Sequence, residues 1–435
     1  MDYDLAIIGA GWAGFNAAIR AKDLGLKVAL IEKGQIGGTC LNLGCIPTKT
    51  LIQSAKVYSL NKKSNLFGID TTDFQINFNK IQERKERIIQ QLRLGMQFCL
   101  RGIDFLNAQA QILSHQELNV GNQIINAKFI LIATGSRPLE LTNLKFDGKK
   151  IISSDDILNL REIPKSLLII GGGVIGCEFA SLFSVLGTQV SIVELMPQLL
   201  PGIDKEVARR LENVFKKKAI MVSTNTDAKT IDLNNYDLAL LCIGRAPEMG
   251  NLDLNKIGIK LDKGRIIVDE YLKTSVSNIY AAGDCATKTM LAHFAAYQGR
   301  IAAENMANPD NPQKADNQNI PNCIFTDPEI ASVGITEENA RDKGIEIKVN
   351  KFDFLGSAMA RILDETEGFV KIISDKKTNV IRGASIIGPR ATELIGILTL
   401  AVTSHLKISQ IQDTIFAHPT LSESISDTLR ESHGV

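Results

Sequence analysis

The chain has 435 residues, of which 44% are hydrophobic and 22% charged, and its formal net charge is +1. This composition is typical of a globular protein of two to four domains, and the balanced charge argues against nucleic acid or an anionic membrane as partner. No apolar run reaches the roughly 18 residues that a membrane helix needs, and no secretory signal precedes the first apolar segment. We therefore expect a cytoplasmic protein with no membrane partner.

The first 32 residues have the pattern of a βαβ unit that binds a dinucleotide. An apolar strand (5–8) leads into Gly9, Gly11 and Gly14, and a helix and a second strand follow, closed by Glu32. The spacing G-x-G-x-x-G permits a tight turn, the approach of a pyrophosphate and close packing of the helix. Glu32 comes 18 residues after Gly14, where it can accept a hydrogen bond from a ribose hydroxyl.

The same pattern occurs a second time. An apolar strand (166–170) leads into Gly171, Gly173 and Gly176, followed by a helix and a strand that Glu194 closes. Glu194 again comes 18 residues after the last glycine. Two such folds predict two dinucleotides with electron transfer between them. Because a 2′-phosphate would meet Glu194 as a like charge, with no arginine beside it, we expect NAD rather than NADP.

Cys40 and Cys45 lie five positions apart among glycines. Five residues on a regular helix rise about 7.5 Å, whereas bridged cysteines have Cα atoms closer than about 7 Å. A Cys40–Cys45 bridge therefore requires a distorted turn and would be easily reduced. Two ordinary buried thiols are the alternative. No second cysteine or histidine pair lies nearby, so we expect no metal site.

The rest of the chain completes an α/β protein with two Rossmann-like dinucleotide-binding domains. A strand near residue 280 ends at Asp284, which suits a sugar or ribityl hydroxyl or else caps the following helix. Residues 305–319 have the composition of a connecting loop. After this loop strands and helices mix, which predicts a separate C-terminal α+β domain.

Two segments carry a resemblance to a known family. Residues 37–49 contain Gly-Gly-Thr-Cys and Cys-Ile-Pro-Thr-Lys, and residues 418–423 are His-Pro-Thr-Leu-Ser-Glu. With these segments the chain resembles the FAD-dependent pyridine nucleotide–disulfide oxidoreductases over nearly its whole length. The resemblance implies an FAD-binding domain in two parts (1–150 and 273–318), an NAD-binding domain (151–272) and a dimerisation domain (319–435).

The resemblance also implies which residues bind the cofactors FAD and NAD. The residues implied for FAD are Gly9, Gly11, Gly14, Glu32, Thr39, Lys49, Thr134, Gly135, Asp284 and the backbone at Ala292. Those implied for NAD are Gly171, Gly173, Gly176, Glu178, Glu194 and Gly244. Lys49 would lie near the flavin ring, where its charge favours the reduced flavin.

The implied chemistry uses four residues. Cys40 would exchange with a dithiol substrate, and Cys45 would pass electrons to the flavin. His418, oriented by Glu423, would be the base, because an imidazole can remove a thiol proton near neutral pH. In this family the base comes from the partner subunit, which implies a homodimer. Without the family, His418 is one of five histidines, and a structural role is the favoured interpretation.

The function implied by the resemblance is oxidation of dihydrolipoyl groups to lipoyl with NAD as acceptor. The implied partner is a lipoyl-bearing acyltransferase of a 2-oxo acid dehydrogenase complex or the glycine cleavage carrier protein. The alternatives are an NAD(P)H-dependent disulfide reductase of the glutathione or mercuric type, and a degenerate FAD-binding scaffold. Glu248 replaces the family's usual asparagine, and about 50 residues separate Glu194 from Gly244, which indicates a trimmed hairpin in the NAD-binding domain.

Overall fold

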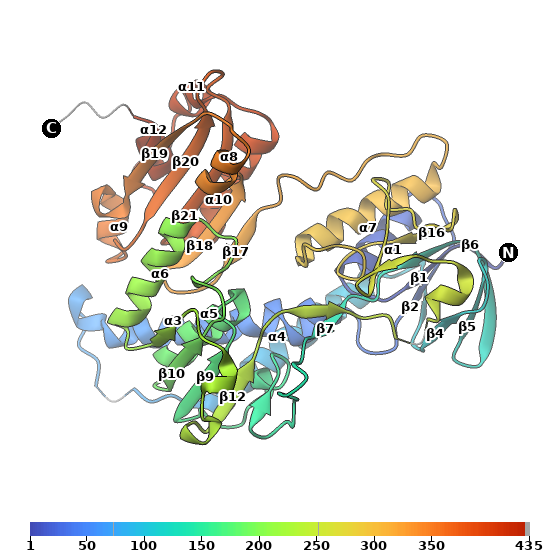
Figure 1. Cartoon of the computed structure of the whole chain (residues 1–435), viewed down its shortest axis with the longest axis horizontal. Coiled ribbons are helices and arrows are strands. Elements are labelled where there is room, and N and C mark those ends of the chain that lie inside the picture. The colour runs from blue at the N-terminus through green and yellow to red at the C-terminus, as the bar shows by residue number, and fades with distance from the viewer. Residues whose placement is uncertain (73, 251, 431–435) are drawn as a thin grey trace.

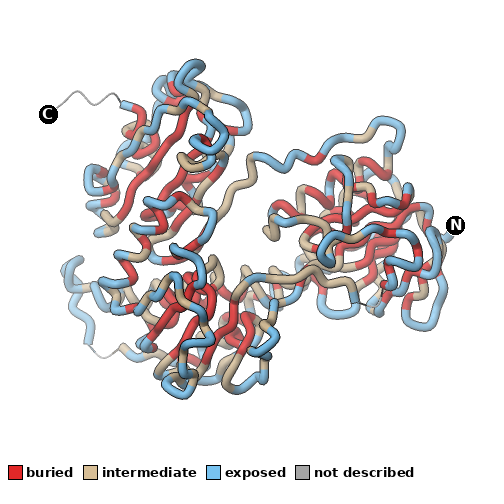
Figure 2. The backbone as a smooth tube through the Cα atoms, viewed as in Figure 1, coloured by how far each residue is buried: buried red, intermediate tan, exposed pale blue. Residues whose placement is uncertain are grey.

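The computed structural model describes residues 1–72, 74–250 and 252–430, which form three units (Figure 1). Each unit has a buried interior surrounded by exposed loops (Figure 2). The first unit is built on a mainly parallel sheet with an antiparallel edge, the second on a parallel sheet and the third on an antiparallel sheet. The predicted α/β class with a C-terminal α+β domain is confirmed. None of the helices formed by the described residues is both long and apolar enough to span a bilayer.

The first unit is organised around strand β1 (Tyr3–Ile8), in which Leu5, Ala6 and Ile7 are fully buried. Such complete burial is expected because both faces of the strand are covered, one by helices and the other by strands and the segment 252–266. The strand order is β3-β2-β1-β6-β5-β4, and β16 pairs with β6. The other strands are β2 (Val28–Ile31), β3 (Asp104–Leu106), β4 (Ala110–Ile112), β5 (Glu117–Val120), β6 (Gln123–Ile132) and β16 (Ile279–Ala281).

Helices α1 and α7 lie side by side against this sheet (Figure 1). Close contact depends on Gly299 of α7, because a Cβ at this position would lie 2.1 Å from the carbonyl oxygen of Ala13 on α1. The helices in this part of the chain are α1 (Trp12–Asp23), α2 (Gly38–Leu43), α3 (Cys45–Lys62), α4 (Phe78–Cys99) and α7 (Ala292–Ala307). Helices α3 and α4 lie beside the second unit (Figure 1), where Leu51, Ala55 and Phe78 join its apolar core. Helix α7 extends three residues into the segment 305–319 that was predicted as a loop. The loop that follows the helix is held by Asn305, whose side-chain oxygen accepts from the N–H of Gln313.

The second unit has a five-stranded parallel sheet in the order β11-β10-β9-β12-β8. Its strands are β8 (Ile151–Ile152), β9 (Ser166–Ile170), β10 (Gln189–Val193), β11 (Met221–Ser223) and β12 (Leu238–Leu241), and its helices are α5 (Val174–Val185) and α6 (Lys205–Lys217). Between β11 and β12, residues 224–237 form only two short 3-10 turns, Ala228–Thr230 and Leu233–Asn235. This short connection agrees with the trimmed hairpin inferred from the sequence.

The chain enters and leaves the second unit through a two-stranded ribbon of β7 (Ser136–Pro138) and β13 (Arg245–Pro247). After β13, Leu254, Ile259 and Ile266 pack in the same apolar cluster as Ile8 of β1. This return segment includes the short strands β14 (Leu261–Asp262) and β15 (Arg265–Ile266). The chain therefore returns from the second unit to the first before residue 272, the predicted boundary. Apolar residues ahead of that boundary already belong to the core of the first unit. The other predicted boundaries stay predictions.

The third unit is an antiparallel sheet in the order β17-β18-β21-β20-β19 with helix α10 packed on it. Its strands are β17 (Asn322–Ile324), β18 (Glu329–Gly334), β19 (Ile347–Asp353), β20 (Phe369–Asp375) and β21 (Ile381–Gly388), and its helices are α8 (Glu337–Asp342), α9 (Ala358–Ile362), α10 (Ala391–Thr403), α11 (Ile408–Gln412) and α12 (Glu423–Leu429). Leu394, Leu398 and Ala401 of α10 recur at helical spacing and are buried against the sheet.

A buried ionic cluster joins the second and third units. Lys371 of β20, 3% exposed, donates to both carboxylate oxygens of Asp204 at 3.1 Å and pairs with Glu206 at 2.8 Å and Glu337 at 2.7 Å. Asp204 also caps α6, where it accepts from the N–H groups of Glu206 and Val207. Burial alone would lower the pKa of Lys371, but hydrogen bonds to Glu206 and Glu337 and the charge of Asp204 raise it.

We predict that Lys371→Met lowers the free energy of unfolding by about 3 kcal/mol, because Asp204 would remain buried without its cation. Lys351→Met is the matched control. Lys351 pairs with the same Glu206 at 2.8 Å but is 34% exposed, so its loss should cost about 1 kcal/mol or less. Urea unfolding of the two variants measures the difference, and equal effects would contradict the larger stabilisation assigned to the buried cation.

Candidate active site

The two cysteines lie on either side of a break between two helices. Cys40 is in α2, Cys45 begins α3, and Gly44 between them has φ −150° and ψ −110°. A Cβ at Gly44 would lie 3.0 Å from the carbonyl oxygen of Thr39 and 3.5 Å from the Cα of Cys40. The glycine therefore allows the start of α3 to approach the backbone next to Cys40. This break is the distorted turn that the spacing predicts, and both side chains are free thiols here.

Hydrogen bonds from Asn42 and from Arg93 of α4 hold the turn before Cys40. Asn42 donates to the carbonyl oxygens of Ile36 at 3.0 Å and Gly38 at 2.9 Å. Arg93 of α4 donates to the Asn42 side-chain oxygen at 2.7 Å. The sequence analysis missed this role of Arg93, since 51 residues separate it from Asn42 and nothing local marks the contact.

The surroundings of the two thiols favour a single negative charge on Cys45. Its pKa is lowered to about 7, first by a hydrogen bond from Cys40 and then by the ammonium group of Lys49, against the effects of burial and Glu178. The shared hydrogen bond and burial raise the pKa of Cys40. One proton therefore stays on Cys40 while Cys45 is the thiolate of the pair.

Lys49 is itself fixed by a buried acid from the second unit. Its Nζ donates to both carboxylate oxygens of Glu178, at 2.9 and 2.8 Å, and Glu178 is 3% exposed. Glu178 also accepts from the N–H of Phe325, which follows β17 of the third unit, at 2.9 Å. The positive charge beside Cys45 is thus held by a residue that all three units contact.

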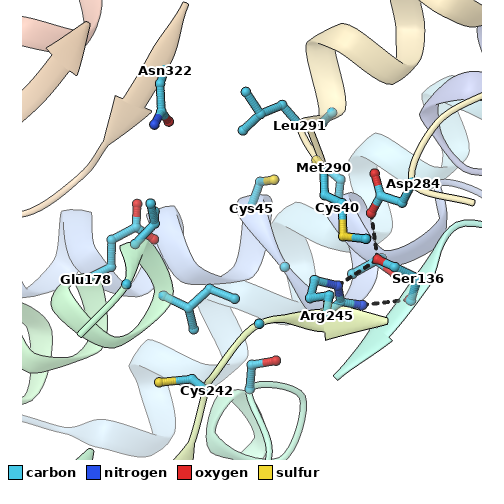
Figure 3. Close-up of a pocket in the computed structure, with 18 of the residues that line it drawn as sticks. Cys40, Cys45, Ser136, Glu178, Cys242, Arg245, Asp284, Met290, Leu291 and Asn322 are labelled. Carbon is cyan, nitrogen blue, oxygen red and sulfur yellow. Dashed lines mark hydrogen bonds between the residues drawn. The ribbon is translucent and has the colours of Figure 1, made fainter. Parts of the chain in front are cut away.

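One cavity of about 1660 Å³ contains most of the predicted site (Figure 3). Cys40 and Cys45 lie in its centre, with Glu178 on one side and Asp284 on the other (Figure 3). The predicted residues that line it are Thr39, Cys40, Cys45, Lys49, Gly135, Gly171, Gly173, Glu178, Glu194, Gly244, Asp284 and Ala292. Gly9, Glu32 and Thr134 line a separate pocket of about 70 Å³.

The two glycine-rich turns have matching backbone geometry. Gly9 and Gly171, each at the end of a strand, have φ of +104° and +113°, where an L side chain is strained. A Cβ at Gly14 would lie 1.8 Å from the oxygen of Gly9, and one at Gly176 would lie 2.0 Å from the oxygen of Gly171. The last glycine of each motif therefore packs its helix onto the turn, as the sequence predicts.

The two predicted acids also occupy matching positions. Glu32 accepts from the N–H of Ala10 at 2.7 Å, and Glu194 accepts from the N–H of Gly172 at 2.6 Å. The second oxygen of each acid accepts from the backbone N–H two residues further on, at 2.7 Å in both. Each acid thus ties the end of its second strand to the glycine turn, where a ribose would lie beside the pyrophosphate.

Both turns have groups that fit a dinucleotide. Helices α1 and α5 begin at Gly11 and Gly173, neither of which supplies a side-chain cap, so the first N–H groups of each helix can bind phosphate. Thr134 Oγ1 is buried beside the first turn and has no hydrogen-bond partner among the described residues. A buried hydroxyl of this kind needs a partner, which a bound nucleotide would supply.

Asp284 belongs to a network that the sequence analysis missed. Ser136 donates to Asp284 at 2.6 Å, and Arg245 donates to the Ser136 hydroxyl at 2.8 Å and to its carbonyl oxygen at 2.7 Å (Figure 3). Burial raises the pKa of Asp284, although Ser136 and Arg245 partly oppose this. The network connects the β7–β13 ribbon with the strand end that carries Asp284. The signal available in the sequence was the segment Gly244-Arg245-Ala246-Pro247, which follows the last strand of the second unit.

His418 and Glu423 lie apart from the cysteines of the same chain. Neither lines the cavity, and the His418 side chain is 73% exposed. Glu423 accepts from His418 Nδ1 at 2.9 Å and from the Thr420 N–H at 2.8 Å, and these bonds, that of Thr420 first, lower its pKa. The predicted pair is therefore formed, and the imidazole is oriented toward solvent on the third unit.

Two dinucleotide turns that open on a cysteine pair define a pyridine-nucleotide-linked disulfide oxidoreductase. The chain belongs to the pyridine nucleotide-disulphide oxidoreductase family, whose model matches residues 3–299, and the dimerisation domain of that family matches residues 320–429. FAD and NAD(H) are the cofactors of this family, as predicted from the sequence.

Individual proteins similar to this chain include two dihydrolipoyl dehydrogenases and a flavoprotein disulfide reductase. A dihydrolipoyl dehydrogenase from Geobacillus stearothermophilus is 40% identical over 97% of this chain and 94% of its own length. One from Chlamydia pneumoniae is also 40% identical, over 97% and 95%. The solved HOCl-induced flavoprotein disulfide reductase RclA from Escherichia coli is 30% identical, with a TM-score of 0.88 over 98% of this chain and 99% of that one.

We predict opposite effects of removing the two charges beside Cys45. In a Cys40→Ser protein, which keeps a hydroxyl donor, Lys49→Met should raise the pH midpoint for alkylation of Cys45 by about one unit, because the thiolate loses its cation. Glu178→Gln should lower this midpoint, because a negative charge is lost. Mass spectrometry of the alkylated peptide across pH measures both, and shifts in the same direction would contradict the charge assignment.

Proposed function

We propose that the protein is a dihydrolipoyl dehydrogenase that oxidises dihydrolipoyl groups to lipoyl with NAD as acceptor. The observation that carries the proposal is the position of Cys40 and Cys45 in one cavity onto which both dinucleotide turns open. The names of the relatives at 40% identity support the choice of substrate. A cytoplasmic location is part of the proposal, since a close cysteine pair in a reducing compartment is typical of redox catalysis.

The two cysteines have different roles in thiol exchange, Cys40 as the sulfur that is attacked and Cys45 as the leaving group. A substrate thiolate attacks Cys40 Sγ of the oxidised pair, the bond to Cys45 breaks, and its electron pair goes to Cys45. Cys40 has no proton to donate in this step, so the positive charge of Lys49, which lowers the pKa of Cys45, is what favours Cys45 as the leaving group. Glu178 keeps the Lys49 ammonium in place through two hydrogen bonds.

His418 of a second copy supplies the base. Because the His418 imidazole of a chain is exposed and outside the cavity, it is available to the cavity of another subunit. Glu423 orients the ring through Nδ1, so Nε2 is the nitrogen that removes the substrate thiol proton. The dimerisation domain provides the contact between copies.

The chain's own residues would hold two cofactors. Gly9, Gly11, Gly14, Glu32 and Thr134 would bind FAD, and Gly171, Gly173, Gly176 and Glu194 would bind NAD, as their matched turns indicate. FAD held there would supply an acceptor for the electron pair of the cysteines and a hydride donor for NAD. The buried carboxylate of Glu194 disfavours a 2′-phosphate and therefore NADP.

The physiological partner in this proposal is a protein that carries a lipoyl group. Lipoyl groups are carried by the acyltransferases of 2-oxo acid dehydrogenase complexes and by the glycine cleavage carrier protein. A disulfide reductase that runs in the opposite direction with NAD(P)H is the second candidate, supported by the likeness to RclA at 30% identity.

A steady-state assay of the FAD-loaded protein tests the function. We expect rapid reduction of NAD by dihydrolipoamide, with much slower reduction of NADP. Cys40→Ser should abolish turnover without loss of bound FAD, because exchange needs the sulfur. His418→Gln should lower kcat by about a hundredfold or more, as expected for loss of general base catalysis. A folded, FAD-loaded protein that reduces no NAD with dihydrolipoamide but oxidises NADPH with other disulfides would favour the second candidate.

A further inference from the structure

Trp12 begins helix α1 in the first glycine turn, and it has a donor without a partner. Its indole Nε1 is buried and makes no hydrogen bond to any described residue. The side chain lines the same cavity as Cys40 and packs against the apolar core of the first unit. Buried indole N–H groups normally have an acceptor, so this donor is expected to serve a group that is present only in some states of the site.

The turn that carries Trp12 touches the segment that carries Cys40. A Cβ at Gly38 would lie 2.7 Å from the Cα of Gly11, so the two backbones are in direct contact one residue from Trp12 and two from Cys40. The hydrogen bond to Cys45 and burial raise the pKa of Cys40, whereas Trp12 and then Lys49 oppose this increase.

We propose that the Trp12 indole N–H is a further catalytic group, which donates to Cys40 Sγ whenever this sulfur carries negative charge. The inference rests on the thiol exchange proposed above. It gives each sulfur of the pair its own stabilising group, with the charge of Lys49 acting on Cys45 and the indole N–H of Trp12 acting on Cys40. A neutral thiol is a weak acceptor, so the indole stays without a partner while Cys40 is protonated.

The charge on Cys40 arises in the second exchange. The remaining substrate thiolate attacks the substrate sulfur that is bonded to Cys40, and the sulfur–sulfur bond of the product forms. The bond to Cys40 breaks and its electron pair goes to Cys40 Sγ. The dithiol is oxidised by two electrons and the cysteine pair is reduced. Of the two substrate protons, one ends on Cys40 and the other leaves through the base, while Cys45 stays a thiolate.

A leaving thiolate departs faster when its pKa is lower, so a donor at Cys40 would speed this step. Within one chain, the titratable groups that act on Cys40 are Cys45 and Lys49, both on α3, and in the proposed dimer His418 of the second copy also faces Cys40. Replacing Cys45 by serine leaves Cys40 as the single thiol of the pair and allows its own titration to be followed.

The test compares Cys45→Ser with Cys45→Ser/Trp12→Phe in the FAD-loaded protein. Phenylalanine keeps an aromatic ring and removes the N–H. Iodoacetamide alkylation of Cys40 is followed across pH by mass spectrometry. We expect the midpoint to rise by about one pH unit in the Trp12→Phe protein, the usual effect of losing a hydrogen bond to a charged group. A purely structural role would change the limiting rate at high pH and leave the midpoint unchanged.

A second measurement keeps Trp12 intact. Trp12 is the one tryptophan in the sequence, so a ¹⁵N-labelled protein has a single indole N–H signal. In the Cys45→Ser protein this signal should shift with the same midpoint as Cys40 alkylation, and it should be independent of pH when Cys40 is also replaced by serine.

The proposal is overturned if the alkylation midpoint is equal in the two proteins, or if the indole signal ignores the titration of Cys40. A signal that responds to removal of FAD alone would assign the donor to the cofactor and would equally contradict the proposal. Because alkylation and the indole signal need no dithiol substrate, these outcomes are independent of whether dihydrolipoamide is the substrate.

Discussion

The close approach of Gly44 to the backbone of Thr39 and Cys40 is the constraint on which the rest of the site depends. A side chain at this position would meet the Thr39 carbonyl oxygen at 3.0 Å. Without the break α2 and α3 would form one helix, and the two sulfur atoms could not exchange a bond. With it, Cys40 stays near the first glycine turn, and Cys45 begins the helix that carries Lys49.

This arrangement gives the two sulfurs different surroundings although they share a hydrogen bond. Cys45 lies near an ammonium group that Glu178 holds from the second unit. Cys40 lies near the turn of the first unit and has no cation as its main neighbour. Negative charge is therefore more stable on one sulfur than on the other, and this difference gives the exchange a direction.

The features that follow a local pattern were predictable from the sequence. Both glycine turns, both acids and the helix break depend on residues close together in the chain, and the structure has them where the patterns predict. Contacts between distant segments were not predictable. The bonds from Arg93 to Asn42, from Ser136 to Asp284 and from Lys371 to Asp204 join residues 51, 148 and 167 positions apart, and no periodicity marks them. The return of the chain to the first unit before residue 272 was missed for the same reason, since only tertiary packing shows which unit Leu254 and Ile266 belong to.

The central claim is that the cysteine pair of one chain works with His418 of another. Coexpression of Cys40→Ser and His418→Ala chains tests it directly, since each variant alone forms dimers without a complete site. In a mixed dimer one of the two sites is complete, so random pairing of two inactive variants should restore about one quarter of wild-type dihydrolipoamide oxidation. Activity that stays at the level of the separate variants, although mixed dimers are isolated, would contradict the claim.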